Sequence, residues 1–125
     1  MTALDTAATA RRYFAAFQSA DRDAMEALLA PGFAFTSPFD DHIDRAAWFE
    51  RCWPFAGSFR FAAAMRVHGG EDEVVVLYET EDKPGGTFRN AECFRFDADG
   101  RIRSIDVYFG FLPPAMIAAM RAAAG

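Results

Sequence analysis

The spacing of apolar residues changes from a helical period to a strand period near residue 58, and this change constrains the fold more than any other feature of the chain. Before it, apolar residues recur at the intervals of an amphipathic helix, at Ala10, Tyr13, Phe14 and Phe17. After it, apolar and polar residues alternate, as they do in a strand with one buried face. This order predicts an α+β domain in which helices precede a sheet.

The first two helices are predicted to form a hairpin. The first covers about residues 3–20. Asp21 is a favourable N-cap for a second, short helix, because its side chain can accept a hydrogen bond from a free backbone N–H. Pro31 and Gly32 are expected to end that helix.

The stretch that follows combines the patterns of strand, turn and helix. Residues 33–37 alternate as a short strand, which Pro38 ends because proline cannot continue a strand ladder. A turn is expected at residues 40–42. Asp44 is then placed to cap a third helix over residues 45–53.

Four long antiparallel strands are predicted in the second half of the chain. The second of them contains the run VVVLY, which indicates a strand buried on both faces. A strongly curved sheet of this kind would wrap around the helical hairpin and the third helix as a cone. The predicted strands cover residues 58–67, 73–81, 87–96 and 101–111.

A single domain is predicted over residues 1–112, since 125 residues suffice for one core. An alanine-rich helix over residues 113–125 follows. Its only large apolar residues are Met116, Ile117 and Met120. We expect this helix to serve as a lid or as a contact to a partner subunit.

Composition argues against several function classes. The formal net charge is -5, with acidic and basic residues interspersed, which argues against a nucleic-acid or membrane partner. The sequence has no membrane-spanning run and no apolar signal core at its start, so a cytoplasmic location is expected. Cys52 and Cys93 are expected to be buried, reduced thiols.

Metal and cofactor binding are not expected. The two histidines, His42 and His68, lack the ligand spacing of a metal site. The common motifs for phosphate, dinucleotide and serine-nucleophile sites do not occur. We therefore expect no metal and no cofactor.

A lined cavity is predicted, because fourteen phenylalanines exceed what a core of this size needs. Asn90 and Glu92 share a strand face with three phenylalanines, so both polar side chains are expected to point inward. A buried, unpaired carboxyl tends to take up a proton, and a raised pKa would make Glu92 a hydrogen-bond donor. The hydroxyl of Tyr13 also needs a partner, which Glu92 could supply.

The orientation of the last strand stays open at this level. Ser104, Asp106 and Tyr108 alternate with apolar residues, and either set can face the cavity. Facing inward, Asp106 is a candidate acid or base. Facing outward, it is a solvated carboxylate beside Arg103.

The stretch FTSPFDDHIDRAAWFERCWP is interpreted as the apolar wall and rim of the cavity. Its DDH segment is either a surface turn ahead of the Asp44 cap or a catalytic rim. The candidate ligand-binding residues are Phe17, Phe35, Ser37, Phe39, Trp48, Trp53, Phe55, Tyr78, Asn90, Phe94 and Tyr108.

The stretches RRYFAAFQSADRDAMEALLAPGFAFTSP and CFRFDADGRIRSIDVYFG, with the helix-to-sheet order between them, resemble the NTF2-like superfamily, in particular its SnoaL-like and ketosteroid-isomerase-like members. The resemblance implies a cystatin-like or NTF2-like α+β barrel. Tyr13 falls where the isomerases have an oxyanion tyrosine, and Glu92 where they have a protonated acid. Ser37, before Pro38, stands where they have an aspartate base.

The resemblance implies that another group would act as base: Asp40, Asp41 or His42, or Asp106, which lies close to a carboxylate of the SnoaL-like cyclases. The expected function is proton transfer next to a carbonyl of an apolar substrate, as in an isomerase, cyclase or lyase. The alternative is a non-catalytic binder or a structural dimer domain. The expected partners are a small apolar molecule and a second copy of the chain, which would form a homodimer through the outer face of the sheet. The candidate catalytic residues are Tyr13, Asp41, His42, Glu92 and Asp106.

Overall fold

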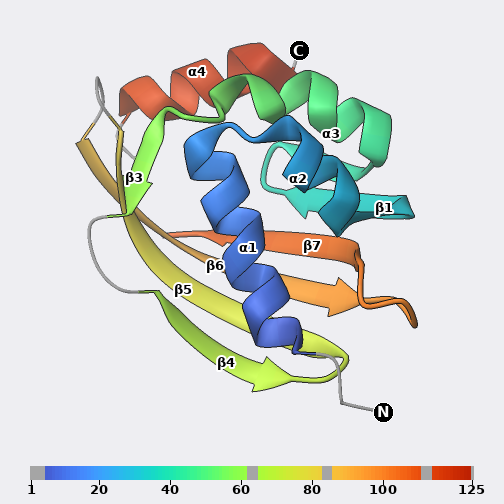
Figure 1. The fold of residues 1–125 in the computed structure, drawn as a ribbon. Helices are drawn as coiled ribbons and strands as arrows, with labels where there is room; N and C mark the ends of the chain where they lie inside the picture. The colour runs from blue at the N-terminus through green and yellow to red at the C-terminus, as the bar shows by residue number, and fades with distance from the viewer. Residues whose placement is uncertain (1–4, 62–64, 83–85, 111–113, 125) are drawn as a thin grey trace.

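The computed structural model describes residues 5–61, 65–82, 86–110 and 114–124. The helices are α1 (Thr6–Ser19), α2 (Arg22–Leu28), α3 (Arg45–Arg51) and α4 (Pro114–Ala124), with a 3₁₀ turn η1 (Trp53–Phe55) after α3 (Figure 1). The strands are β1 (Leu29–Ser37), β2 (Asp40–Asp44), β3 (Phe59–Phe61), β4 (Arg66–Gly70), β5 (Glu73–Asp82), β6 (Gly86–Phe96) and β7 (Ile102–Phe109).

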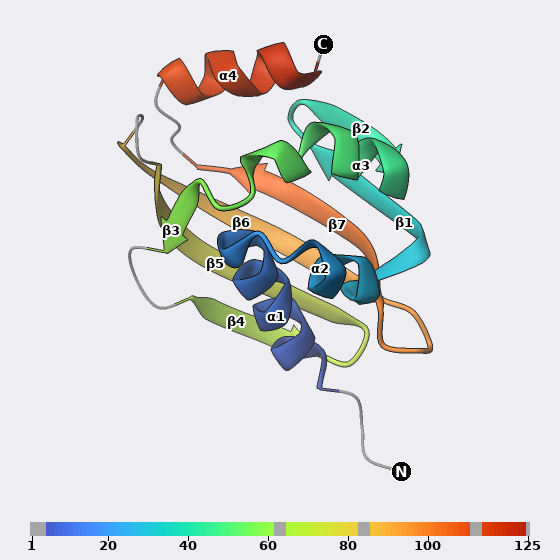
Figure 2. The ribbon, with the colours of Figure 1, turned by 45° about the horizontal axis from the view of Figure 1, so that its top comes forward.

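The strands form one mixed, curved sheet in the order β2-β1-β7-β6-β5-β3, with β4 also paired to β5. Its pairings are antiparallel except that of β1 with β7, which is parallel. The helices α1 and α2 lie across the concave face, and α4 runs over one end of the sheet (Figures 1 and 2). The predicted α+β fold with a curved sheet around the helices is confirmed, although the sheet stays open and does not close into a barrel.

Aspartate caps begin the first three helices. The carboxylates of Asp5, Asp21 and Asp44 each accept a hydrogen bond from the backbone N–H three residues later, at 3.0, 3.1 and 2.9 Å. These bonds satisfy donors that a helix start leaves free. The caps predicted at Asp21 and Asp44 are therefore confirmed.

The region around β1 and β2 differs from the prediction. The strand β1 begins at Leu29, directly after α2, so Pro31 and Gly32 lie within a strand and do not end the helix. The predicted turn at residues 40–42 is the start of β2. The hydrogen-bonded pairing with β1 outweighs the turn preference of the acidic residues there, and the turn lies one step earlier, at residues 38–39.

The long strand expected from residue 58 is two strands in the structure. β3 pairs with the end of β5 and β4 pairs with its beginning. The run VVVLY is buried on one face only: Val74 and Val76 are fully buried, whereas Val75 and Leu77 are half-buried. No described helix covers the outer face of the sheet, which explains the difference (Figure 2). The connection between β5 and β6, at residues 83–85, lies outside the described residues.

The helix α4 packs on the rest of the chain through Met116, which is buried. The boundary predicted at residue 112 lies outside the described residues and stays a prediction. Within the described ranges, the helices are all too short or too polar to cross a membrane.

Candidate functional site

A cavity of about 130 Å³ lies between the concave face of the sheet and the helices α1, α3 and α4. Its wall is mainly aromatic, with rings contributed by α1, β1, β3 and β5. The predicted ligand-binding residues that line it are Phe17, Phe35, Ser37, Phe39, Trp48, Phe55, Tyr78 and Asn90. Among the predicted catalytic residues, Tyr13 and Glu92 line it as well.

Three predicted ligand-binding residues lie away from this cavity. Phe94 is a fully buried core residue whose ring packs against Tyr13. Trp53 packs edge-on against Phe17, behind the wall. Tyr108 is 63% exposed on the outer face of the sheet, because its neighbour Phe109 is the one that lines the cavity.

The deep polar group of the cavity is a hydrogen-bonded set of Tyr78, Asn90 and Glu92. The Tyr78 hydroxyl donates to Glu92 Oε2 and accepts a 3.0 Å hydrogen bond from Asn90 Nδ2. β5 and β6 bring the three together, since Tyr78 is the register partner of Asn90 and Val76 that of Glu92. The inward orientation predicted for Asn90 and Glu92 is what the structure shows.

Burial raises the pKa of Glu92 from 4.5 to about 7, and the hydrogen bond from Tyr78 opposes this shift only in part. Since desolvation penalises the charged form, a large share of Glu92 is protonated near neutral pH. The protonated carboxyl can donate a hydrogen bond to a ligand oxygen. Glu92 can therefore act as a hydrogen-bond donor, as its inward position on the predicted strand led us to expect.

Tyr13 lies on α1 close to this set, but the partner of Glu92 is Tyr78 and not Tyr13. Burial, followed by the nearby Glu92 carboxyl, raises the pKa of Tyr13 well above 10. The phenol therefore stays protonated at all physiological pH values. It lines the same cavity as Glu92 and can donate to the same ligand.

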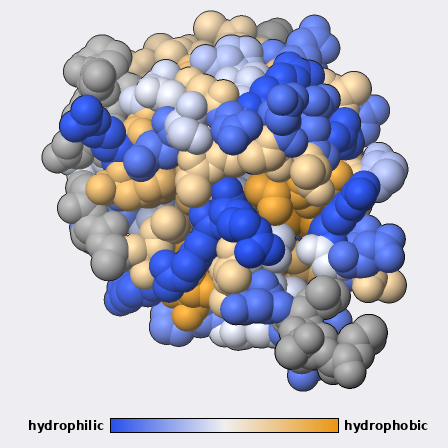
Figure 3. Space-filling view, viewed as in Figure 1, coloured by the Kyte–Doolittle hydropathy of each residue, from blue (hydrophilic) through white to orange (hydrophobic). Residues whose placement is uncertain are grey.

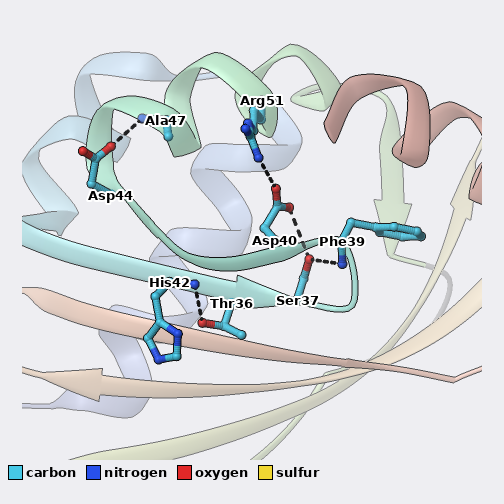
Figure 4. Close-up of polar contacts among 8 residues, drawn as sticks. All are labelled: Thr36, Ser37, Phe39, Asp40, His42, Asp44, Ala47 and Arg51. Carbon is cyan, nitrogen blue, oxygen red and sulfur yellow. Dashed lines mark hydrogen bonds and ion pairs between the residues drawn. The ribbon is translucent and has the colours of Figure 1, made fainter. Parts of the chain in front are cut away.

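The outer polar group of the cavity joins β1, β2 and α3 (Figure 4). The carboxylate of Asp40 accepts a 3.0 Å hydrogen bond from Arg51 Nη1 and a 3.3 Å hydrogen bond from the Ser37 hydroxyl. Ser37 Oγ in turn accepts from the backbone N–H of Phe39 at 3.1 Å. The Asp40 side chain is only 9% exposed and that of Arg51 is 38% exposed. This arrangement holds a carboxylate at the cavity wall in a fixed position.

Asp41 and His42 lie outside the cavity. Their side chains are 90% and 76% exposed and contact each other at 2.6 Å. In Figure 4 the His42 ring lies on the opposite side of β1 and β2 from Asp40. Of the three DDH residues, only Asp40 reaches the place beside Ser37 that the family resemblance assigns to a base.

Asp106 faces outward, so of the two orientations left open by the sequence the inward one is excluded, and Asp106 cannot act as an acid or base in this cavity. Its carboxylate accepts a 3.2 Å hydrogen bond from Arg95 and lies in a polar groove on the outer side of the sheet, together with Arg103 and His42. The alternation along β7 decides this, because Val107 and Phe109 take the cavity side.

Three further residues line the cavity that are not among the candidates predicted from the sequence: Arg51, Thr80 and Met120. Arg51 is three residues after Trp48, one helical turn away on the same face of α3, and this spacing could have identified it. For Met120 the pattern shows only an apolar helix face. What that face covers follows from tertiary packing alone.

Cys52 also lines the cavity, and burial, with the nearby Asp40 and Glu92 carboxyls, raises its pKa to about 12. Its thiol is therefore protonated and a poor nucleophile. Within the described ranges, His, Cys, Asp and Glu side chains nowhere gather in groups of three that could hold a metal ion.

Comparison with known proteins supports the family resemblance. A protein from Kribbella flavida is 26% identical, covers 96% of this chain and 94% of its own, and superposes with a TM-score of 0.73. An NTF2-like protein of unknown function from Cytophaga hutchinsonii is 19% identical over 94% and 97% of the two chains, with a TM-score of 0.69. A protein from Sinorhizobium meliloti, provisionally named a polyketide cyclase, is 22% identical over 81% and 94%, with a TM-score of 0.62.

A comparison with curated protein sequences finds no significant match. The family model described as the SnoaL-like domain matches residues 10–105, which is most of the chain and runs from within α1 into β7. The chain therefore belongs to the SnoaL-like domain family.

Proposed function

We propose that this SnoaL-like, small-molecule-binding domain transfers a proton next to a carbonyl group of its ligand without a cofactor. One observation carries the proposal: the carboxylate of Asp40 and the protonatable carboxyl of Glu92 line the same apolar cavity. Two carboxyl groups in different environments can serve as base and as hydrogen-bond donor. Asp40 forms an ion pair with Arg51 at 3.0 Å, whereas burial raises the pKa of Glu92 to about 7, so that a large share of Glu92 is neutral near pH 7.

In the proposed reaction, Asp40 takes a proton from the carbon next to the carbonyl. The electron pair of the broken C–H bond forms a carbon–carbon double bond, and the π electron pair of the carbonyl group moves to its oxygen, which becomes an enolate oxygen. Glu92 and Tyr13 donate hydrogen bonds to that oxygen, each worth on the order of 3 kcal/mol in the transition state. Asp40 then returns the proton to the same or another carbon. Arg51 is a positioning residue, because it holds the carboxylate and does not touch the reacting atoms.

The test follows the exchange of α-protons in deuterated buffer by NMR, with 4-hydroxycyclohexanone as the probe. We expect Asp40→Asn to lower the exchange rate by about a hundredfold, because the amide cannot accept the proton. Asp41→Asn is the matched control, since Asp41 is adjacent but exposed, and should leave the rate unchanged. Equal rates in the Asp40→Asn variant and the unmodified protein would exclude Asp40 as the base.

A non-catalytic binder is the second candidate, and the hydrogen bonds themselves favour it. Asp40 is satisfied by Arg51 and Ser37, and Glu92 Oε2 by Tyr78, so both carboxyl groups already have partners within the protein. In that case the probe binds, but its α-protons exchange at the rate in buffer alone.

A further inference from the structure

The volume of the cavity limits the ligand to a small size. A cavity of about 150 Å³ holds a benzene molecule, and pockets for drug-sized ligands span about 300–1,000 Å³. The cavity here measures about 130 Å³. Its enclosed part therefore accommodates one six-membered ring or an equally compact branched chain.

The deep wall of the cavity is closely packed and leaves no room for enlargement. Phe14 lies with its ring centroid 4.9 Å from that of Tyr78 and 5.1 Å from that of Tyr13. Trp48, which also lines the cavity, is fully buried and packs against Phe33. Because close-packed interiors resist volume changes, this end of the cavity fixes the size of the ring that it can hold.

At the other end α4 contributes Met120 and Ala123 to the wall of the cavity. Ala123 is exposed and Arg51 partly so, which locates the mouth of the cavity between α4 and α3. Met120 is half-buried behind that mouth. Methionine side chains fill irregular gaps and adapt their shape, so Met120 limits how far a ligand extends toward solvent.

Buried polar atoms without a partner gather on residues of this wall. Among the described residues they include Trp48 Nε1, Thr80 Oγ1, Asn90 Oδ1 and Glu92 Oε1. An unsatisfied buried polar atom costs about 1–3 kcal/mol, so such a concentration at one cavity points to a ligand that supplies the missing partners. The indole N–H needs an acceptor, and the amide oxygen of Asn90 needs a donor.

We propose that the substrates of this site are compact, single-ring hydroxy-ketones or molecules of equal size with one hydrogen-bond donor and one carbonyl acceptor, and that Met120 sets the upper size limit. The inference rests on the proposed function, because it takes this cavity as the substrate site. Larger fused-ring ketones exceed the space between the deep aromatic wall and α4.

The test measures the affinities of 4-hydroxycyclohexanone, the two-ring 6-hydroxy-1-tetralone and a four-ring hydroxysteroid ketone by calorimetry. We expect the single-ring compound to bind at least about tenfold more tightly than the two-ring compound, and the steroid not to bind. Equal or tighter binding of a fused-ring compound, or no binding of the single-ring compound, overturns the size limit. Binding of the single-ring compound without proton exchange leaves the size limit standing and contradicts only the proposed proton transfer.

The need for a donor is tested with 4-methylcyclohexanone, in which a methyl group replaces the hydroxyl. We expect at least about fivefold weaker binding, since the ligand no longer satisfies the Asn90 oxygen. Equal affinities would show that the ligand hydroxyl is not recognised.

The role of Met120 is tested by Met120→Ala against Ile117→Ala. Both residues are half-buried on α4, but only Met120 lines the cavity. We expect Met120→Ala to raise the affinity for 6-hydroxy-1-tetralone about tenfold and Ile117→Ala to leave it unchanged. The same response in both variants would assign the effect to α4 as a whole and not to Met120. The series of three ketones on the unmodified protein tests the size limit independently of either variant.

Discussion

Glu92 links the chemistry of the cavity to the stability of the fold. Its pKa rises from 4.5 to about 7 because it is buried, so the folded protein keeps a proton that the unfolded chain releases above pH 4.5. Its contribution to stability is therefore complete below the unfolded pKa and is lost as the pH rises through the folded pKa. The difference corresponds to roughly 3 kcal/mol of unfolding free energy.

We predict that Glu92→Gln abolishes this part of the pH dependence, because the amide does not titrate. Urea unfolding of both proteins at intervals from about pH 4.5 to about pH 8.5 measures it. The unmodified protein should lose roughly 3 kcal/mol relative to the variant between these limits, mostly below pH 7. Parallel curves for the two proteins would contradict a raised pKa at Glu92.

The residues of the site were predictable to different degrees. Asn90 and Glu92 follow from alternation within one strand, since the face that carries phenylalanine must be the interior. Asp40 could not be distinguished from Asp41 and His42 as a candidate base, because its side chain reaches the cavity only once β2 pairs with β1 and α3 brings Arg51 alongside. The partner of Glu92 was also hidden, since Tyr78 comes from a neighbouring strand whose register no single strand reveals.

At the level of elements, the β4–β5 turn requires a glycine at one of two adjacent positions. Gly69 has φ +94, and a Cβ there would lie 2.6 Å from the backbone oxygen of Glu73. At Gly70 a Cβ would meet nothing within 4 Å. Only Gly69 therefore needs the conformational freedom that glycine provides.

We predict that Gly69→Ala destabilises the protein by roughly 1–3 kcal/mol, because the side chain forces the turn open. Gly70→Ala is the matched control and should change the unfolding free energy by less than about 0.5 kcal/mol. Thermal and urea unfolding of the two variants measure the difference. Similar losses in both would show that the turn tolerates rearrangement.

The element boundaries show where local patterns suffice. The caps at Asp21 and Asp44 lie where the sequence predicts them, because the interaction spans three residues. The extent of β1 was underestimated, since Pro31 and Gly32 oppose a strand locally and only pairing with β7 and β2 stabilises it. No local sequence pattern predicts the parallel pairing of β1 with β7, because the two strands are far apart along the chain.

A row of apolar residues, half-buried except for the exposed Tyr108, runs across the outer face of the sheet. Leu77, Ala91 and Tyr108 are register partners across β5, β6 and β7, and Val75 and Cys93 lie beside them. No described helix covers this face (Figure 2), whereas the side formed by α1 and α2 shows strongly hydrophobic residues only in small patches (Figure 3). The expected homodimer through this outer face stays a prediction, as does the cytoplasmic location.

We predict that Tyr108→Asp shifts the protein from dimer to monomer, since an aspartate at the centre of an apolar interface must lose its hydration. Sedimentation velocity measures the change. Ala15→Asp, on the exposed side of α1, is the control and should leave the dimer intact. If the unmodified protein is a monomer, or if Tyr108→Asp remains a dimer, the outer face of the sheet is not a dimer interface.

The parallel contact of β1 with β7 has a consequence for biosynthesis. Ala34 and Ser104 are partners although about seventy residues separate them. During translation β1 therefore leaves the ribosome long before β7 is synthesised. Until then the apolar side chains of β1 have no β7 to pack beside. A nascent chain that ends before Ile102 lacks β7, so both its sheet and the part of the cavity wall formed by Val107 and Phe109 are incomplete.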